Sequence, residues 1–249
     1  MEDRDGGHGT KVREPALRAD AFEADLLERF SAHDALAGVE GMSDDAFLEM
    51  LLQRRFLSLL FPVMYDLGID ALDDEGAVRL VREILREEYP DASGATPSHR
   101  EDLVSDLLVL GASRGLILSS RPSAVTAGVI EETLEIMREA SVEAGDAAVL
   151  TILRFWGEVL VSVEYGEFWR RMEERFAAAG VTSRFYHPHH HHDGREPLAA
   201  ASESSRTHSG RLGSSLVRLL DGDGHLEAFE RVESRVLDMR LRFYDQFVL

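Results

Sequence analysis

The chain has 249 residues, 44% of them hydrophobic, and its 46 acidic against 27 basic residues give a formal net charge of -19. This apolar content is enough for a buried core, and the length suits one domain. The negative charge argues against nucleic acids and anionic membranes as partners, and the absence of cysteine excludes disulfides, thiol nucleophiles and thiolate metal sites.

Residues 1–15 are polar, charged and without periodicity, which predicts a disordered N-terminal tail. They do not resemble a secretory signal, and no later apolar run is long enough to span a membrane, so we expect a cytoplasmic protein. From residue 16 onward the apolar residues recur with a helical period. Helices are expected at residues 16–32, 43–67, 74–89, 98–110, 123–144, 147–179, 182–192, 208–220 and 226–247.

Local signals mark several of these helix ends. Ser43 is a suitable N-cap, and Ser98 with Glu101 has the spacing of a capping box. Pro62 should kink or split the second helix, and Gly68 should end it. No alternating strand pattern is present, so the chain is expected to be all-α, a single-domain bundle of seven to nine helices.

The most conspicuous motif is a histidine tract. Residues 189–192 are four consecutive histidines, His187 precedes them by two positions, and Asp193 follows directly. Imidazole and carboxylate groups suit iron, manganese or zinc, so the tract is a candidate metal site. An exposed loop that takes up metal only adventitiously explains the same residues equally well.

Glu158 is a second candidate, because it lies in the strongly apolar segment 147–163. A buried carboxylate is costly unless a cation neutralises it, which makes Glu158 a candidate metal ligand. An ion pair with Arg154, four residues earlier on the same helix, is an equally weighted structural alternative.

Further candidate ligands lie near helix ends. Glu87 and Glu88 end one expected helix and His99 opens the next, so a carboxylate and an imidazole can meet there. Solvent-exposed side chains are the simpler interpretation of these residues. Asp66 lies near the end of the second helix, where an acidic residue is mildly unfavourable. A lone histidine at a helix start, such as His208, is usually structural.

Together these motifs resemble the haem-oxygenase-like di-iron oxidases, also called iron-containing redox enzymes. In that family two irons are bound by a Glu at a helix end, a His about ten residues later, a Glu on a later apolar helix and a final His-x-x-x-Asp-x-x-His helix. Glu88, His99 and Glu158 match the first three features, and His189 with Asp193, preceded by an aromatic pair, matches half of the last. Asp66 lies where the family has its first carboxylate, usually Glu. The choice of His189 within the tract rests on this family spacing.

The chain departs from the family pattern after Asp193. Glu196 stands where the last histidine is expected, and residues 194–206 have the composition of an insertion. His208, just beyond this segment, could restore the missing ligand. The departure puts the second iron in doubt.

The resemblance implies one haem-oxygenase-like helical domain over residues 16–249. It also implies an oxidoreductase, a non-haem O2-dependent oxidase or oxygenase with Fe(II), two ions per chain. The implied metal ligands are Asp66, Glu88, His99, Glu158, His189, Asp193 and His208, with no catalytic residues beyond them. The substrate would be a small molecule such as an amino acid, an amine or a fatty acid in a biosynthetic pathway. The reaction would be N-oxygenation, desaturation or C–C cleavage.

An electron-donating partner and a homodimer are compatible with this function. Two alternatives stand beside it. One is a cofactor-free enzyme of the same fold, with Glu158 as an acid or base. The other is a helical binding protein without metal, in which the histidine tract is only a loop.

Overall fold

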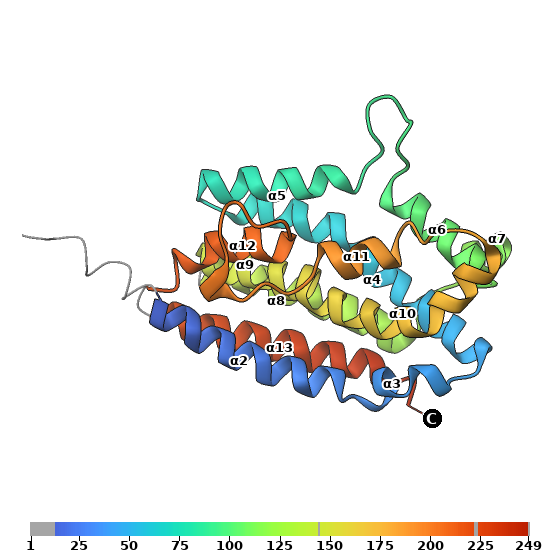
Figure 1. Cartoon of the computed structure of the whole chain (residues 1–249). Helices are drawn as coiled ribbons and strands as arrows, with labels where there is room; N and C mark the ends of the chain where they lie inside the picture. Colours follow the sequence, from blue (N-terminus) through green and yellow to red (C-terminus); the bar gives the residue numbers. More distant parts are fainter. Residues whose placement is uncertain (1–12, 144, 222–223, 249) are drawn as a thin grey trace, which may run out of the picture.

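The computed structural model describes residues 13–143, 145–221 and 224–248. Over these ranges the chain is helical and has no strand, and its helices surround one continuous apolar core (Figure 1). The expected all-α, single-domain architecture is confirmed. Of the disordered tail expected at residues 1–15, residues 1–12 lie outside the described residues. Within the described ranges, no helix is both long and apolar enough to cross a membrane.

In chain order the elements are α2 (Arg13–Ser31), α3 (Asp34–Ala37), the 3-10 turn η1 (Val39–Gly41), α4 (Asp44–Ala71), α5 (Glu75–Glu87), α6 (His99–Val109), α7 (Arg114–Ser119), α8 (Ala124–Glu143), α9 (Gly145–Arg154), the π-helical turn η2 (Phe155–Val159), α10 (Leu160–Ala179), α11 (Tyr186–His192), the 3-10 turn η3 (Leu198–Ala200), α12 (His208–Val217) and α13 (His225–Asp245). Helices α9, η2 and α10 follow one another without a gap and correspond to the expected helix at residues 147–179. The short helices α3 and α7 lie in segments for which the sequence made no prediction.

The long helix formed by α9, η2 and α10 lies in the middle of the bundle (Figure 1). Helix α13 packs against α2 on one side and against α8 and α9 on the other. Helix α4 packs against α5, α8 and α9, while α11 lies on α10 and α12 lies on α9. Elements far apart in the sequence therefore surround η2.

Helix α4 begins as expected, because the Ser43 hydroxyl accepts a hydrogen bond from Ala46 N at 3.2 Å. Helix α4 is not split at Pro62, and the expected stop at Gly68 is wrong, since α4 continues to Ala71. Burial of apolar side chains on both sides of the proline outweighs one lost backbone hydrogen bond. Gly68 serves helix packing instead: a Cβ there would lie 2.7 Å from Leu153 Cδ1 of α9.

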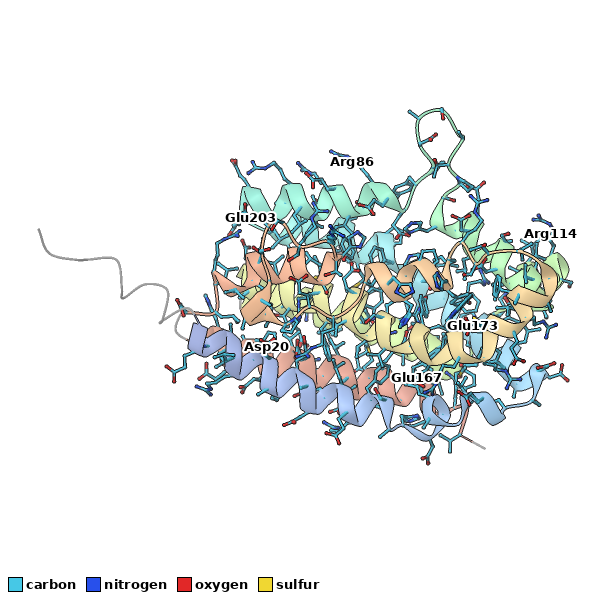
Figure 2. All side chains as sticks on the ribbon, viewed as in Figure 1. Asp20, Arg86, Arg114, Glu167, Glu173 and Glu203 are labelled. Atoms are coloured by element: carbon cyan, nitrogen blue, oxygen red, sulfur yellow. The ribbon has the colours of Figure 1, made fainter. Side chains whose placement is uncertain are left out.

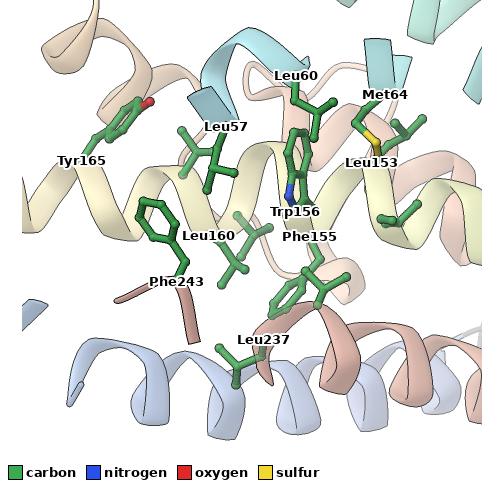
Figure 3. Packing of buried hydrophobic residues seen from close by; sticks show 14 of the residues in the cluster. Leu57, Leu60, Met64, Leu153, Phe155, Trp156, Leu160, Tyr165, Leu237 and Phe243 are labelled. Atoms are coloured by element: carbon green, nitrogen blue, oxygen red, sulfur yellow. The ribbon is translucent and has the colours of Figure 1, made fainter. Parts of the chain in front are cut away.

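The core is built where α4 and α13 pack on the central helix. Figure 3 shows Trp156 and Leu160 of the central helix between Leu57 of α4 and Leu237 of α13. Charged side chains such as those labelled Arg86, Arg114 and Glu173 in Figure 2 lie on the outside and are exposed. The buried charges, in contrast, gather along η2 and its two neighbours in the chain.

The π-helical turn η2 is fully buried and carries Glu158. Its closing backbone hydrogen bond runs from Leu160 N to Phe155 O, one residue longer than the α-helical pattern. Such turns occur mostly as single bulges inside α-helices and frequently at functional sites. The acidic residue in the apolar segment thus coincides with an irregularity of the backbone.

Candidate metal centre

The first cluster of metal-binding groups consists of Glu88, His99 and His189, whose nearest ligand atoms all lie within 4.8 Å of one another. Glu88 is the C-cap residue of α5, and His99 is the first residue of α6. His99 Nδ1 lies 2.7 Å from Glu88 Oε1, and the His99 and His189 rings are 4.6 Å apart. The capping box of Ser98 and Glu101, present as expected, fixes the start of α6 and so the position of His99.

His189 reaches this cluster because the start of α11 is anchored on α6. The Asp106 carboxylate accepts hydrogen bonds from the Ser183 hydroxyl and from the backbone N–H groups of Phe185 and Tyr186. His189 Nδ1 lies 2.6 Å from the carbonyl oxygen of Phe185, which can only accept, so Nδ1 donates and Nε2 carries the lone pair. Metal-bound histidines are commonly held in this way by a carbonyl on the second nitrogen.

The second cluster consists of Glu158, Asp193 and His208, again with ligand atoms within 4.8 Å of one another. His208 Nδ1 lies 3.4 Å from Glu158 Oε2 and 3.5 Å from Asp193 Oδ1. The Tyr65 hydroxyl donates a hydrogen bond to Glu158 Oε1. Glu158 Oε2 is buried and has no hydrogen-bond partner within the described ranges.

The second cluster holds two buried carboxylates against one imidazole. Burial and then the charge of Glu158 raise the pKa of Asp193 well above its ordinary value. Burial lowers the pKa of His208, but Glu158, Asp193 and Glu87 together outweigh that effect and raise it to about 12. In this metal-free cluster bound protons thus offset the two carboxylates, and a divalent cation would take over that role.

Both clusters line the same cavity, which has a volume of about 390 Å³. The cavity lies between α4, the central helix and the starts of α6, α11 and α12. Apolar side chains form much of its wall, among them Leu57, Phe61, Pro62, Leu103 and Val161. Apolar walls with a few convergent polar groups are typical of small-molecule sites.

The structural alternative for Glu158, an ion pair with Arg154, is not present. The Arg154 guanidinium binds both carboxylate oxygens of Glu23 and donates to the backbone carbonyls of Ser209 and Glu196. Because Arg154 is engaged in these contacts, Glu158 contacts His208 and Tyr65 instead.

The donor sets fit iron. The first cluster offers two imidazoles and one carboxylate, the combination that holds non-haem Fe(II) in many oxygenases. The second offers two carboxylates and one imidazole, also hard and borderline ligands suited to Fe, Mn or Zn. Glu158 Oε2 is buried and accepts no hydrogen bond from the described residues, with only the His208 imidazole 3.4 Å away, which is the observation that most directly favours a cation there.

No protein-family model and no curated protein matches the chain, but solved structures do. A CADD-like protein of unknown function from Nostoc punctiforme has a TM-score of 0.64 at 11% identity, over 93% of this chain and 97% of its own. Its second crystal structure gives 0.63 at 11% identity, over 96% and 95%. The fold is haem-oxygenase-like. A TenA family transcription regulator from a Silicibacter species gives 0.60 at 13% identity, over 94% and 96%.

At these identities the likeness establishes the haem-oxygenase-like fold alone. It assigns no activity, and the residues of this chain must carry the functional argument.

Within this haem-oxygenase-like bundle, His208 lies where a ligand was missing from the sequence motif. Helix α12 begins at His208, and the preceding segment folds back so that its imidazole meets Asp193. Glu196 does not take this place: its carboxylate accepts hydrogen bonds from the Ser205 and Thr207 hydroxyls and so braces the segment.

Asp66 is the one predicted ligand that the structure does not bring to either cluster. It is exposed on α4, whereas its neighbour Tyr65 is buried and contacts Glu158. Successive residues of an α-helix point about 100° apart, and here Tyr65 turns into the core while Asp66 turns to the surface.

The other described histidines of the tract, His187, His190 and His191, lie apart from the clusters. His190 Nδ1 approaches the carbonyl of Ser162 at 3.1 Å, and His187 and His191 bring their Nε2 atoms within 3.3 Å of each other. The side chain of His192 is outside the description. Among the described tract side chains, His189 is the one that belongs to a cluster.

Two contacts of the site were not predicted, although Glu87 itself was a candidate ligand. Tyr65 holds Glu158, and Glu87 Oε2 lies 3.2 Å from His208 Nε2. For the contact of Tyr65 with Glu158, the available signal was a tyrosine within the apolar stretch of α4. The contact of Glu87 with His208 depends on how residues 194–207 fold, which no local pattern reveals.

Proposed function

We propose that this chain is a non-haem, O2-dependent oxidase or oxygenase that uses two iron ions and acts on a small molecule. The observation that carries the proposal is the convergence of two three-residue clusters on one cavity, with a buried carboxylate oxygen that accepts no hydrogen bond from the described residues. Glu88, His99 and His189 would hold one ion, and Glu158, Asp193 and His208 the other. Ferrous ions there would supply electrons for the reduction of O2.

The surrounding side chains hold these ligands in place. The Phe185 carbonyl orients His189 through Nδ1, and Glu87 orients His208 through Nε2. The Tyr65 hydroxyl donates a hydrogen bond to Glu158 Oε1. Burial and the charge of Glu158 raise the pKa of Tyr65 well above its ordinary value, so the hydroxyl keeps its proton and remains a donor. The apolar wall of the cavity limits water around a bound substrate.

Metal counting tests the proposal. Chelator-treated protein is loaded with Fe(II) under anaerobic conditions, and bound iron is measured after desalting. We expect two ions per chain, about one for His99→Ala and for Asp193→Asn, and two for the control His187→Ala, whose imidazole lies outside both clusters. Exposure to air should then consume O2 in proportion to the bound iron.

Two results would contradict the proposal. If His99→Ala and Asp193→Asn bind as much iron as the parent and the His187→Ala control, the clusters are not a metal site. Specific binding of iron without any O2 consumption would leave a metal protein that is not an oxidase.

A further inference from the structure

The cavity has a second polar end, made by guanidinium groups. Arg54 of α4 and Arg240 of α13 both line the cavity and converge on Glu164 of α10. Arg54 Nε lies 2.7 Å from Glu164 Oε2, and Arg240 Nη1 lies 2.6 Å from Glu164 Oε1. The exposed fractions of these side chains are 3%, 0% and 0%. Two permanent positive charges thus share one buried carboxylate.

The charges at this end do not balance. Among the described residues, Glu164 is the acidic partner of both arginines, and arginine stays protonated in proteins. The other groups closest to them, Tyr165 and Tyr244, are neutral phenols whose pKa burial raises. An excess buried positive charge is costly without a counter-ion.

Unpartnered donors point to the same conclusion. Arg240 Nε and Trp156 Nε1 are buried without a hydrogen-bond acceptor within the part of the chain that the structure describes, and both side chains line the cavity. The Ser58 hydroxyl accepts from Arg54 Nη1 at 3.0 Å and lies 3.0 Å from the Tyr165 hydroxyl. The donors and positive charge of the described residues at this end therefore exceed the acceptors there, which are the Glu164 carboxylate, the Ser58 hydroxyl and the Trp156 carbonyl.

We propose that the substrate is a carboxylate with an apolar body, and that the Arg54–Arg240 end of the cavity binds its carboxylate group. The apolar body would lie along Leu57, Phe61 and Val161, which line the same cavity as the two arginines and the metal-binding clusters. The carboxylate is then an anchor and not a metal ligand. A simple amine does not fit, because its ammonium group would meet an excess of positive charge. That the bound carboxylate is a substrate rests on the function proposed above, whereas binding of the anion requires no metal.

Metal-free protein provides the test. Calorimetric titration of the full chain in chelator compares octanoate with octanamide and octylamine, which share the alkyl chain and differ in the charge of the head group. We expect octanoate to bind about tenfold or more tightly than either, since charge-assisted hydrogen bonds to guanidinium exceed those to a neutral amide. Equal binding of octanoate and octanamide would overturn the inference.

Variants locate the anion. Arg54→Gln leaves Arg240 and Glu164 as a balanced pair, so the protein should fold, and the preference for octanoate should disappear. Arg55→Gln is the matched control: this neighbouring arginine bonds the Ile117 carbonyl and the Ser120 hydroxyl and does not line the cavity. Ser58→Asp gives a second variant, because it places a resident carboxylate beside Arg54 and should also abolish the preference.

The result separates this inference from the proposed function. Octanoate preference in metal-free protein that fails to bind iron would support the anion site and contradict the oxidase. Octanoate binding that appears only with bound iron, and that survives Arg54→Gln, would show the carboxylate ligating metal and would overturn the inference while the oxidase stands.

Discussion

Replacement of Glu158 by glutamine distinguishes a metal ligand from a structural ion pair. Glu158 Oε2 lies 3.4 Å from His208 Nδ1, an attraction of about 5 kcal/mol at an effective dielectric constant of about 20. An ionised Asp193 carboxylate, within 4.8 Å, would repel an ionised Glu158 by at least about 3.5 kcal/mol on the same basis. The net attraction, at most about 1.5 kcal/mol, is then smaller than the several kcal/mol of desolvation for a buried ion.

Without metal, Glu158→Gln should therefore unfold with a free energy within about 1 kcal/mol of the parent or above it. The amide oxygen still accepts from Tyr65, and His208 keeps its contacts with Asp193 and Glu87. With Fe(II) at a hundred times its dissociation constant, the parent should gain about 2.7 kcal/mol from each site. The Glu158→Gln variant should lose the gain of about 2.7 kcal/mol that iron at the second cluster contributes.

The assay is urea denaturation under anaerobic conditions, with chelator or with Fe(II). Glu23→Gln is the control, because Glu23 is buried and bound by Arg154 and Arg195, and loss of such a partner costs about 3–5 kcal/mol. If metal-free Glu158→Gln also loses 3 kcal/mol or more, Glu158 stabilises the fold and the reasoning is refuted.

Three further predictions concern single contacts. Tyr65→Phe should lower iron affinity about 10–100-fold in a chelator competition, since the hydroxyl orients Glu158; unchanged affinity would remove Tyr65 from the site. Gly166→Ala should cost about 1–3 kcal/mol and reduce iron uptake, because its Cβ would lie 2.8 Å from a His190 ring atom and push α11 away, whereas Gly128→Ala, with open space around it, should not. Burial and the charge of Glu23 raise the pKa of Glu233, so the folded chain keeps this proton after the unfolded chain has lost it. Stability should therefore fall as pH rises above about 4.5, by about 1.4 kcal/mol per unit of pKa difference. Glu233→Gln should make the fall shallower in urea titrations from pH 4.5 to 8, with Asp193 and His208 accounting for the remainder; a parallel fall in the variant would contradict this.

Features set by neighbouring residues were predictable from the sequence. The cap at Ser43 and the capping box at Ser98 depend on a few positions, and the structure contains both. The helical segments followed from apolar spacing in the same way. The end of α4 was not predictable, because the close approach of Gly68 to Leu153 is a contact between helices.

The candidate site shows the same division. Glu88 and His99 are joined by a short loop, so their meeting followed from the order of two helices. The partner of Arg154 is Glu23, which lies far away in the sequence. No spacing rule could have shown that Arg154 pairs with Glu23 and not with Glu158. Asp66 was misplaced because a shift of one position turns a helical side chain by about 100°.

The π-helical turn constrains how this chain can vary. Deleting one residue from Phe155–Val159 would restore ordinary α-helical hydrogen bonding and would also rotate everything beyond the turn by about 100° relative to α9. Glu164 and Tyr165 lie beyond it, and the segment that contacts Glu23 lies before it. Relatives that keep both polar ends of the cavity should therefore tolerate substitutions in this turn far more readily than any change in its length.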